Sequence, residues 1–202
     1  MRSWKSLFLV TVMLLLVPAA AFASGGWMVD VRGGVGIPMG NYKDDFKSGL
    51  LIGVDASRMM SPQFAIGVDG NYIKNGVTDA NKLALETQFG AGTDANTKFT
   101  HYGVHGKYMM SNKEASKVMP YLVGGVGLYH IKASITNSGT SFDASENKFG
   151  FRGGIGSNFM VGPNWGLGVQ ADYNDVLTSG SSTQYLGVAG GVHFNLTPSS
   201  SK

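Results

Sequence analysis

Ionisable side chains occur in the middle of otherwise apolar stretches of this chain, and their chemistry needs an explanation first. Eight of them form the candidate set: Asp30, Arg32, Asp55, Asp69, His105, Lys107, Arg152 and Asp172. Groups of these types act in catalysis, hold a metal, or neutralise one another as buried ion pairs. The surrounding motifs and elements decide between these possibilities.

No motif of a catalytic or metal site accompanies these residues. GxSxG and HExxH are absent, the paired glycines never extend to GxGxxG, and there is no cysteine. His101 and His105 share a strand face, but their separation of four positions corresponds to about 13 Å of extended chain, too far to share a metal. We therefore predict no catalytic residue, no cofactor and no metal. The histidines are expected to be structural residues of a polar interior: His101, His105, His130 and His193.

Eight segments alternate apolar and polar residues, which is typical of β-strands with two different faces. In NWGLGVQADYND, for example, Trp165, Leu167 and Val169 alternate with glycine and polar residues. The other segments are WMVDVRGGVGIPM, GLLIGVDAS, FAIGVDGNY, HYGVHGKYMM, PYLVGGVGLYHIK, KFGFRGGIGSNFMV and QYLGVAGGVHFNL. The candidate residues lie on the polar faces.

The connections between these segments alternate in length. Short turns around SPQ, SNKEASK and VGPN follow the second, fourth and sixth segments, and longer polar loops such as SITNSGTSFDASE follow the others. This is the pattern of outer-membrane proteins, whose short turns are periplasmic. We predict an all-β fold, an eight-stranded antiparallel up-and-down transmembrane β-barrel with both termini in the periplasm. In the long loop 74–98, ANKLALETQFG is expected to form a short helix or to extend a hairpin.

Aromatic residues gather at the strand ends, which favours lipid rather than a protein core on the apolar side. The ring near the short turns comprises Trp27, Phe64, Tyr108, Tyr121, Phe159, Trp165 and Phe194. The ring near the long loops comprises Tyr72, Tyr102, Tyr129, Phe149, Phe151 and Tyr173. Two aromatic girdles around an aliphatic band match the two interfaces of a membrane. A soluble lipocalin-like binder is the weaker alternative.

The segment PYLVGGVGLYHIK is apolar on both faces, so the pattern leaves its orientation open. We favour an outward direction for Tyr121, Val123, Tyr129 and Ile131.

The polar faces should meet in a lumen only wide enough for side chains. Glycines on these faces leave room for long charged residues. We expect Arg32 to pair with Asp55 or Asp69, and Arg152 with Asp172, giving a lumen without a continuous pore. A gate that opens by exchanging pairs is the alternative.

The chain ends suggest an exported protein. Residues 1–23 carry Arg2 and Lys5, an apolar run and the small-residue site Ala21-Phe22-Ala23, the layout of a cleaved signal peptide. Residues 24–196 form the predicted barrel domain, and residues 197–202 a short polar periplasmic tail. The chain carries 16 basic and 13 acidic residues without a basic stripe, so no nucleic-acid partner is expected.

Within this pattern, the runs PYLVGGVGLY and FGFRGGIGSNF resemble the OmpA/OmpX-type family of small outer-membrane β-barrels. The chain departs from the family at its end, where Phe194 is followed by Asn195, Leu196 and TPSSSK without a peptidoglycan-binding domain. The resemblance implies a non-enzymatic integral outer-membrane protein with a charge-plugged lumen, which contributes to envelope integrity or to surface contact through its loops.

The expected partners are outer-membrane lipid including lipopolysaccharide and, in transit, periplasmic chaperones and the barrel-assembly machinery. The protein is expected to be a monomer. A narrow OmpW-type channel for small solutes and a lipid-modifying outer-membrane enzyme are the alternative functions.

Overall fold

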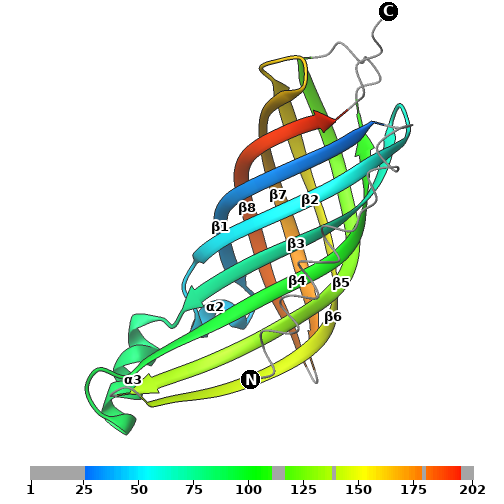
Figure 1. Cartoon of the computed structure of the whole chain (residues 1–202). Coiled ribbons are helices and arrows are strands. Elements are labelled where there is room, and N and C mark those ends of the chain that lie inside the picture. Colours follow the sequence, from blue (N-terminus) through cyan, green and yellow to red (C-terminus); the bar gives the residue numbers. More distant parts are fainter. Residues whose placement is uncertain (1–25, 111–116, 138–139, 179–180, 197–202) are drawn as a thin grey trace, which may run out of the picture.

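Eight antiparallel strands pair in chain order, and β1 closes on β8 to complete a barrel (Figure 1). In this computed structural model the described residues are 26–110, 117–137, 140–178 and 181–196. The strands are β1 (Trp27–Met39), β2 (Gly49–Ser61), β3 (Phe64–Gly76), β4 (Asp94–Met109), β5 (Val118–Asn137), β6 (Thr140–Met160), β7 (Trp165–Thr178) and β8 (Ser181–Leu196). The predicted fold class is confirmed. The predicted signal peptide, the turn at 111–116 and the C-terminal tail lie outside the described residues.

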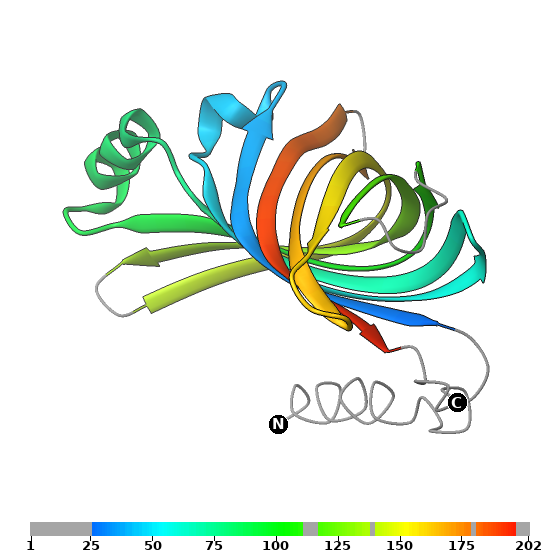
Figure 2. The same cartoon turned by 90° about the horizontal axis from the view of Figure 1, so that it is seen from above.

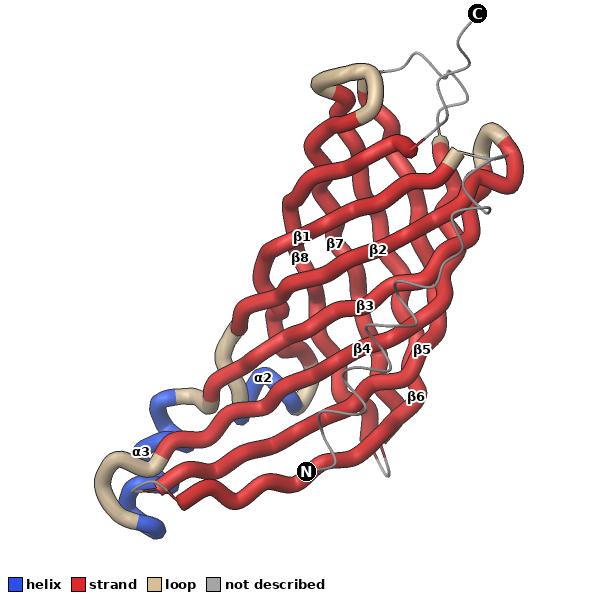
Figure 3. Tube along the Cα trace, in the orientation of Figure 1, coloured by secondary structure: helices blue, strands red, loops and turns tan. Residues whose placement is uncertain are grey.

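The two described helices lie at the end of the barrel opposite the short turns (Figure 3). Helix α2 (Tyr42–Asp45) follows β1, and helix α3 (Asp79–Phe89) follows β3. Both alternatives for the 74–98 loop are realised, because α3 forms and β3 and β4 also extend into it. No helix among the described residues is long and apolar enough to cross a membrane.

Strands β5 and β6 are the longest, with 20 and 21 residues against 13 in each of β1 to β3. Together with β4 they extend beyond the rest of the barrel, next to α3 (Figure 2). The prediction of a polar loop at SITNSGTSFDASE is therefore wrong. Residues 134–137 and 140–146 continue the two strands, because their cross-strand pairing runs without interruption from Val118↔Phe159 to Asn137↔Thr140.

Strict alternation of side chains separates the outer face of the barrel from its lumen. Outward residues in the middle of the strands are aliphatic and about half exposed, as are Val68, Val104 and Val169. Inward residues are buried and mostly polar or glycine. The predicted direction is correct for the apolar faces of β1 to β4 and β6 to β8. The aromatic residues assigned to the two girdles on these strands point outward as well.

The orientation favoured for β5 is wrong. Tyr121 and Tyr129 are buried in the lumen, with 2% and 0% exposure, whereas Leu122 and Leu128 face outward. The cause lies in the neighbouring strand β6. An added Cβ at Gly156 would come within 2.4 Å of the Tyr121 ring, and one at Gly150 within 2.7 Å of the Tyr129 ring. Glycines on β6 thus make the space that the two rings occupy, so neither tyrosine belongs to an outer girdle.

Because the outward valines are taken to face lipid, a charge in their middle should be destabilising. We expect Val104→Lys to lower the free energy of unfolding in lipid vesicles by about 2–4 kcal/mol, and Val161→Lys, beyond the end of β6, by about 1 kcal/mol or less. Reversible unfolding in urea, followed by tryptophan fluorescence, measures both. Equal losses at the two positions would contradict a lipid-facing band.

Candidate functional site

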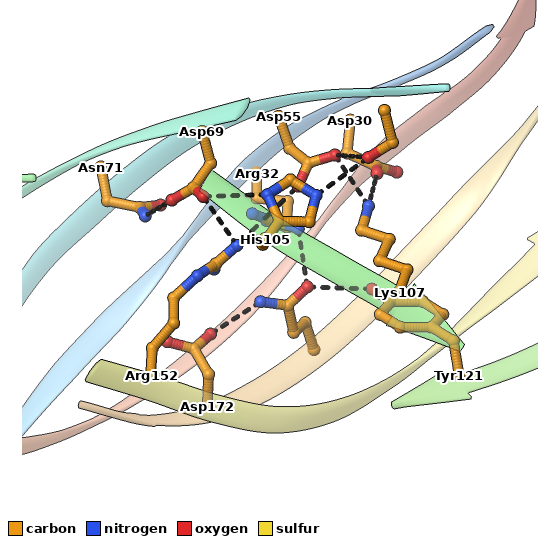
Figure 4. A network of polar contacts seen from close by, with 12 residues as sticks. Asp30, Arg32, Asp55, Asp69, Asn71, His105, Lys107, Tyr121, Arg152 and Asp172 are labelled. Atoms are coloured by element: carbon orange, nitrogen blue, oxygen red, sulfur yellow. Dashed lines mark hydrogen bonds and ion pairs between the residues drawn. The ribbon is translucent and has the colours of Figure 1, made fainter. Parts of the chain in front are cut away.

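The lumen contains a layer of charged side chains contributed by several strands (Figure 4). Asp30, Asp55 and Asp69 are direct cross-strand neighbours on β1, β2 and β3, so three carboxylates lie side by side on the inner wall. All three are buried, with exposures of 7% or less. Like charges directly opposite one another destabilise a sheet, and buried charges need partners. The cations come from other strands.

Lys107 of β4 neutralises two of the carboxylates. Its Nζ atom lies 2.6 Å from Asp30 Oδ2 and 2.8 Å from Asp55 Oδ1, and the residue is only 1% exposed. The ammonium group also lies 5.4 Å from the centre of the Tyr121 ring, within the range of a cation–π contact. His193 of β8 adds a second contact to Asp30, with 2.8 Å between Nδ1 and Oδ1.

Asp69 is surrounded by three basic groups. His101 Nδ1 and His105 Nδ1 lie 3.0 Å and 2.9 Å from its carboxylate oxygens. Arg152 of β6 places Nη2 at 3.0 Å from Asp69 Oδ1 and at 4.0 Å from Asp55 Oδ2. These Arg152 contacts are ion pairs by distance without the alignment of hydrogen bonds, since none of its guanidinium nitrogens has a hydrogen-bond partner.

The predicted pairing scheme is wrong in its partners. Arg152 contacts Asp69 and Asp55, not Asp172. Arg32 donates a hydrogen bond from Nη1 to Gln170 Oε1 (2.7 Å), and Gln170 in turn donates to Asp172 Oδ1 (2.8 Å). The prediction compared heights along neighbouring strands, but Arg152 of β6 reaches across the lumen to β2 and β3, and Arg32 of β1 reaches past β8 to β7. Gln170 was missed although its place on the polar face of β7 could have indicated it.

Ser57, His105 and Asp69 form a hydrogen-bonded chain that resembles a catalytic triad and that the sequence did not suggest. Ser57 Oγ is 2.9 Å from His105 Nε2, and His105 Nδ1 is 2.9 Å from Asp69 Oδ1. In a triad the serine gives its proton to the histidine. Here the Ser57 hydroxyl donates to Asp55 Oδ1 (2.9 Å), and His105 Nε2 itself lies 3.0 Å from Asp55 Oδ2, so a second carboxylate competes for both groups. Ser57 has 0% exposure. The arrangement therefore fits a structural link better than a nucleophile.

Two apolar clusters inside the barrel lie on either side of the charged layer. One, towards the short turns, comprises Met28, Ala65, Met109, Tyr121 and Val123. The other, towards the long loops, comprises Leu51, Ile73, Phe99, Tyr129, Val176, Tyr185 and Ala189. Tyr42 of α2 packs onto the second cluster, with its ring 5.6 Å from that of Phe99 in an edge-on contact. The helix thus reaches into the mouth of the barrel.

One predicted interior histidine lies elsewhere. His101, His105 and His193 are buried in the lumen, but His130 is exposed on the outer face of β5 and contacts Asn147. This error follows from the reversed orientation of β5. Across the described parts of the chain, no group of three or more His, Asp or Glu side chains has the geometry of a metal site.

Comparison with known proteins identifies a family and one relative that this chain resembles. The family model described as "Outer membrane protein beta-barrel domain" matches residues 9–196. Outer membrane protein PagN of Salmonella typhimurium is 31% identical over 132 residues, a match that covers 60% of this chain and spans only about half (54%) of PagN.

Solved structures agree on the fold. Neisserial surface protein A superposes with a TM-score of 0.58 at 20% identity, covering 85% of this chain and 99% of that one. Ail, the attachment invasion locus protein of Yersinia pestis, in complex with the heparin analogue sucrose octasulfate, superposes with a TM-score of 0.54 at 15% identity and the same coverage. The closed barrel and the family match lead to one conclusion: the chain belongs to the outer membrane protein beta-barrel domain family and resides in the bacterial outer membrane with periplasmic termini.

Proposed function

We propose that the protein is a non-enzymatic barrel with a closed lumen, which acts through its extracellular part. The observation that carries the proposal is the pairing of the lumen carboxylates with basic side chains of the same lumen. The carboxylates of Asp30, Asp55 and Asp69 are matched by Lys107, Arg152 and histidines at 2.6–3.0 Å. Groups that neutralise one another in a small barrel are not available to a solute.

The apolar clusters count against the alternative of a narrow channel. On one side of the charged layer, an ion on the barrel axis would have to pass the rings of Phe99, Tyr129 and Tyr185. On the other side it would have to pass the Tyr121 ring and the side chains of Met28 and Met109. Apolar constrictions exclude ions because water leaves them. The charged layer therefore serves stability in this proposal, and the small interior of an eight-stranded barrel is filled.

The extracellular part of the chain has an open strand edge and exposed apolar side chains that a partner could contact. Among the described residues the β6–β7 pairing begins at Gly150, and the distal part of β6, from Thr140 to Asn147, pairs with β5 and leaves its other edge open. Open strand edges and exposed apolar side chains are common elements of recognition. Phe142 at 72% and Leu83 of α3 at 66% are the most exposed large apolar residues. The Asn137 side chain fixes the extension by donating to Phe89 O and to Thr93 Oγ1.

Surface contact is therefore the role we favour over envelope integrity alone. The name of Ail refers to attachment and invasion, and a contact role of this general kind suits the open extension of the present chain. The barrel would be the anchor that holds this extension outside the cell.

Removing the central lumen cation tests the charged layer. Lys107→Met leaves Asp30 and Asp55 without their ammonium partner, and we expect a loss of about 3–5 kcal/mol in the free energy of unfolding. Lys82→Met on the exposed face of α3 is the matched control and should change it by less than about 0.5 kcal/mol. The wild-type protein should pass no steady current in planar bilayers. Steady current, or a harmless Lys107→Met, would contradict a self-neutralised lumen.

A covalent probe tests whether Ser57 is a nucleophile. We expect a fluorophosphonate to leave Ser57 unmodified in the folded protein, because the hydroxyl is buried and donates to Asp55. Mass spectrometry of the digested protein reads the result, with Ser57→Ala as the blank. An adduct on Ser57 that is absent from the heat-denatured protein would overturn the non-enzymatic assignment.

Shortening the extension separates its role from that of the barrel. Lys132 and Ser145 are direct cross-strand partners, so an Asn-Gly turn replacing residues 133–144 should close the hairpin without disturbing the barrel. Intact cells carrying the short form should lose most binding to surfaces coated with sulfated glycan or matrix protein, while their detergent resistance is unchanged. Retained binding combined with lost detergent resistance would favour envelope integrity instead.

A further inference from the structure

Five methionines point into the lumen near the short turns, and we call them the methionine ring. Each lies two positions along its strand from a buried lumen residue, as Met59 does from Ser57 and Met160 from Asn158. The members are Met28, Met59, Met109, Met119 and Met160. No other inward position of the described strands carries a methionine. Met39, Met60 and Met110 occupy outward positions and are exposed.

Strand register places the members of the ring at one height in the barrel. Following direct cross-strand partners once around the wall from Trp27 leads back to β1 at Ile37, ten residues closer to the long loops. The shear of the barrel is therefore ten residues over eight strands. A path at constant height must return by about 1.25 residues per strand towards the short turns.

From Met28, this level path passes within about two residues of every other member of the ring. At about 3.3 Å per residue and a tilt of about 40°, the five methionines share about 5 Å of barrel height. The same path brings Lys107 to the height of Asp30, with which it forms an ion pair at 2.6 Å. Five thioethers thus converge on one level of an interior only wide enough for side chains.

The two apolar clusters of the lumen differ in the residues that fill them. The cluster towards the long loops contains leucine, isoleucine, valine and aromatic residues and no methionine. The cluster towards the short turns contains Met28 and Met109, and Met59 packs against it. Leucine and isoleucine fill a core with better-defined rotamers than methionine does. Filling the barrel therefore does not by itself require thioethers at one mouth, and a second property of methionine becomes relevant.

The charged layer next to the ring can accept one more positive charge. Apart from its histidines, the layer contains four carboxylates and three cations, namely Asp30, Asp55, Asp69, Asp172, Arg32, Lys107 and Arg152. Thioethers are neutral, so an ion bound to them keeps its charge, and Asp30 is the next inward residue after Met28 on β1. Buried charges need partners. A monovalent cation would balance the excess carboxylate, whereas a divalent cation would exceed it.

We propose that the methionine ring is a thioether site for a soft monovalent metal ion, Cu(I), at the periplasmic mouth of the lumen. Thioether sulfur selects Cu(I), whereas carboxylate and carbonyl oxygen suit harder ions. Met28 and Met109 are 4% and 5% exposed, and the other three members are half-buried, so the ion reaches the ring from the short-turn side.

The sequence-based expectation of no metal considered cysteine and histidine ligands. The methionines come from five strands, and only the register of the closed barrel brings them to one height. The site is independent of the extracellular contact surface, because it lies at the opposite end of the barrel.

Metal binding by the folded protein, prepared without an affinity tag, tests the proposal. The probe is Cu(I), titrated without oxygen in competition with the chelator bicinchoninate. Zn(II) and Mn(II) are the comparison ions, because they suit imidazole and carboxylate ligands. In the ring variant all five members are replaced by leucine, which keeps the apolar volume without a sulfur atom. The matched control, Met39→Leu/Met60→Leu/Met110→Leu, removes the outward methionines. Heat-modifiable gel mobility confirms that each variant is folded.

We expect the wild type and the control to bind Cu(I) with the same affinity and the ring variant to lose this binding. Binding of Zn(II) and Mn(II) should be weak and independent of the ring. A second measurement needs no variant. In protein with isotope-labelled methionine methyl groups, Ag(I), a diamagnetic ion of the same charge, should shift the NMR signals of the ring. The signals of Met39, Met60 and Met110 should stay in place.

The outcomes that contradict the site are distinct. A ring variant that binds Cu(I) as the wild type does would assign the ion to histidines or carboxylates. A wild type that binds no Cu(I), or Ag(I) shifts confined to the outward methionines, would leave the ring as a flexible packing element. Ring-dependent binding of Zn(II) tighter than that of Cu(I) would contradict selection of a soft monovalent ion. None of these results bears on the extracellular contact surface.

Discussion

The wall of this barrel is one residue thick, so every strand residue must point either to the lipid or to the lumen. Closure of β1 on β8 satisfies the backbone hydrogen bonds at what would otherwise be two open edges. Within that wall, alternate residues of a strand point to opposite faces, so a residue's position in the strand decides whether its side chain meets lipid or the lumen. Asp55 and Val54 are adjacent in the sequence, yet one is 1% and the other 43% exposed, and they experience opposite surroundings. The charged layer and the apolar clusters both follow from this constraint.

Cross-strand register then turns single charges into rows, and the two faces of the wall treat the rows differently. Inside, Asp30, Asp55 and Asp69 are tolerated because the lumen is narrow enough for Lys107 and Arg152 to reach them. Outside, no opposite wall exists, and only a neighbouring strand or the surroundings can supply counterions. The same repulsion is therefore resolved from across the lumen on the inside, whereas on the outer face the neighbouring strand β6 supplies Asp143 to Lys132.

Alternation was enough to predict the barrel and the direction of most strands, because it depends only on local sequence. It failed at β5, where both faces are apolar and the decision rests on Gly150 and Gly156 of the next strand. The alternation also predicts which charged residues face the lumen, but it does not identify their partners. Arg152 reaches Asp69 across the interior, and such contacts depend on the curvature and shear of the closed sheet. The distal part of the β5–β6 hairpin, residues 134–146, has mostly polar residues on both faces, which is common in strands that extend into water. The sequence alone therefore predicts a loop there.

Two features of the outer surface share strands and so constrain each other. Lys98 and Lys132 are direct partners on β4 and β5, and Lys132 lies opposite Ser145 of β6, beyond the β6–β7 pair Gly150↔Val176. The open edge of β6, from Thr140 to Asn147, lies on the same hairpin. A rigid base loses less conformational entropy when a partner binds at the tip. The paired strands β4, β5 and β6 would therefore set the orientation in which the proposed contact surface is presented.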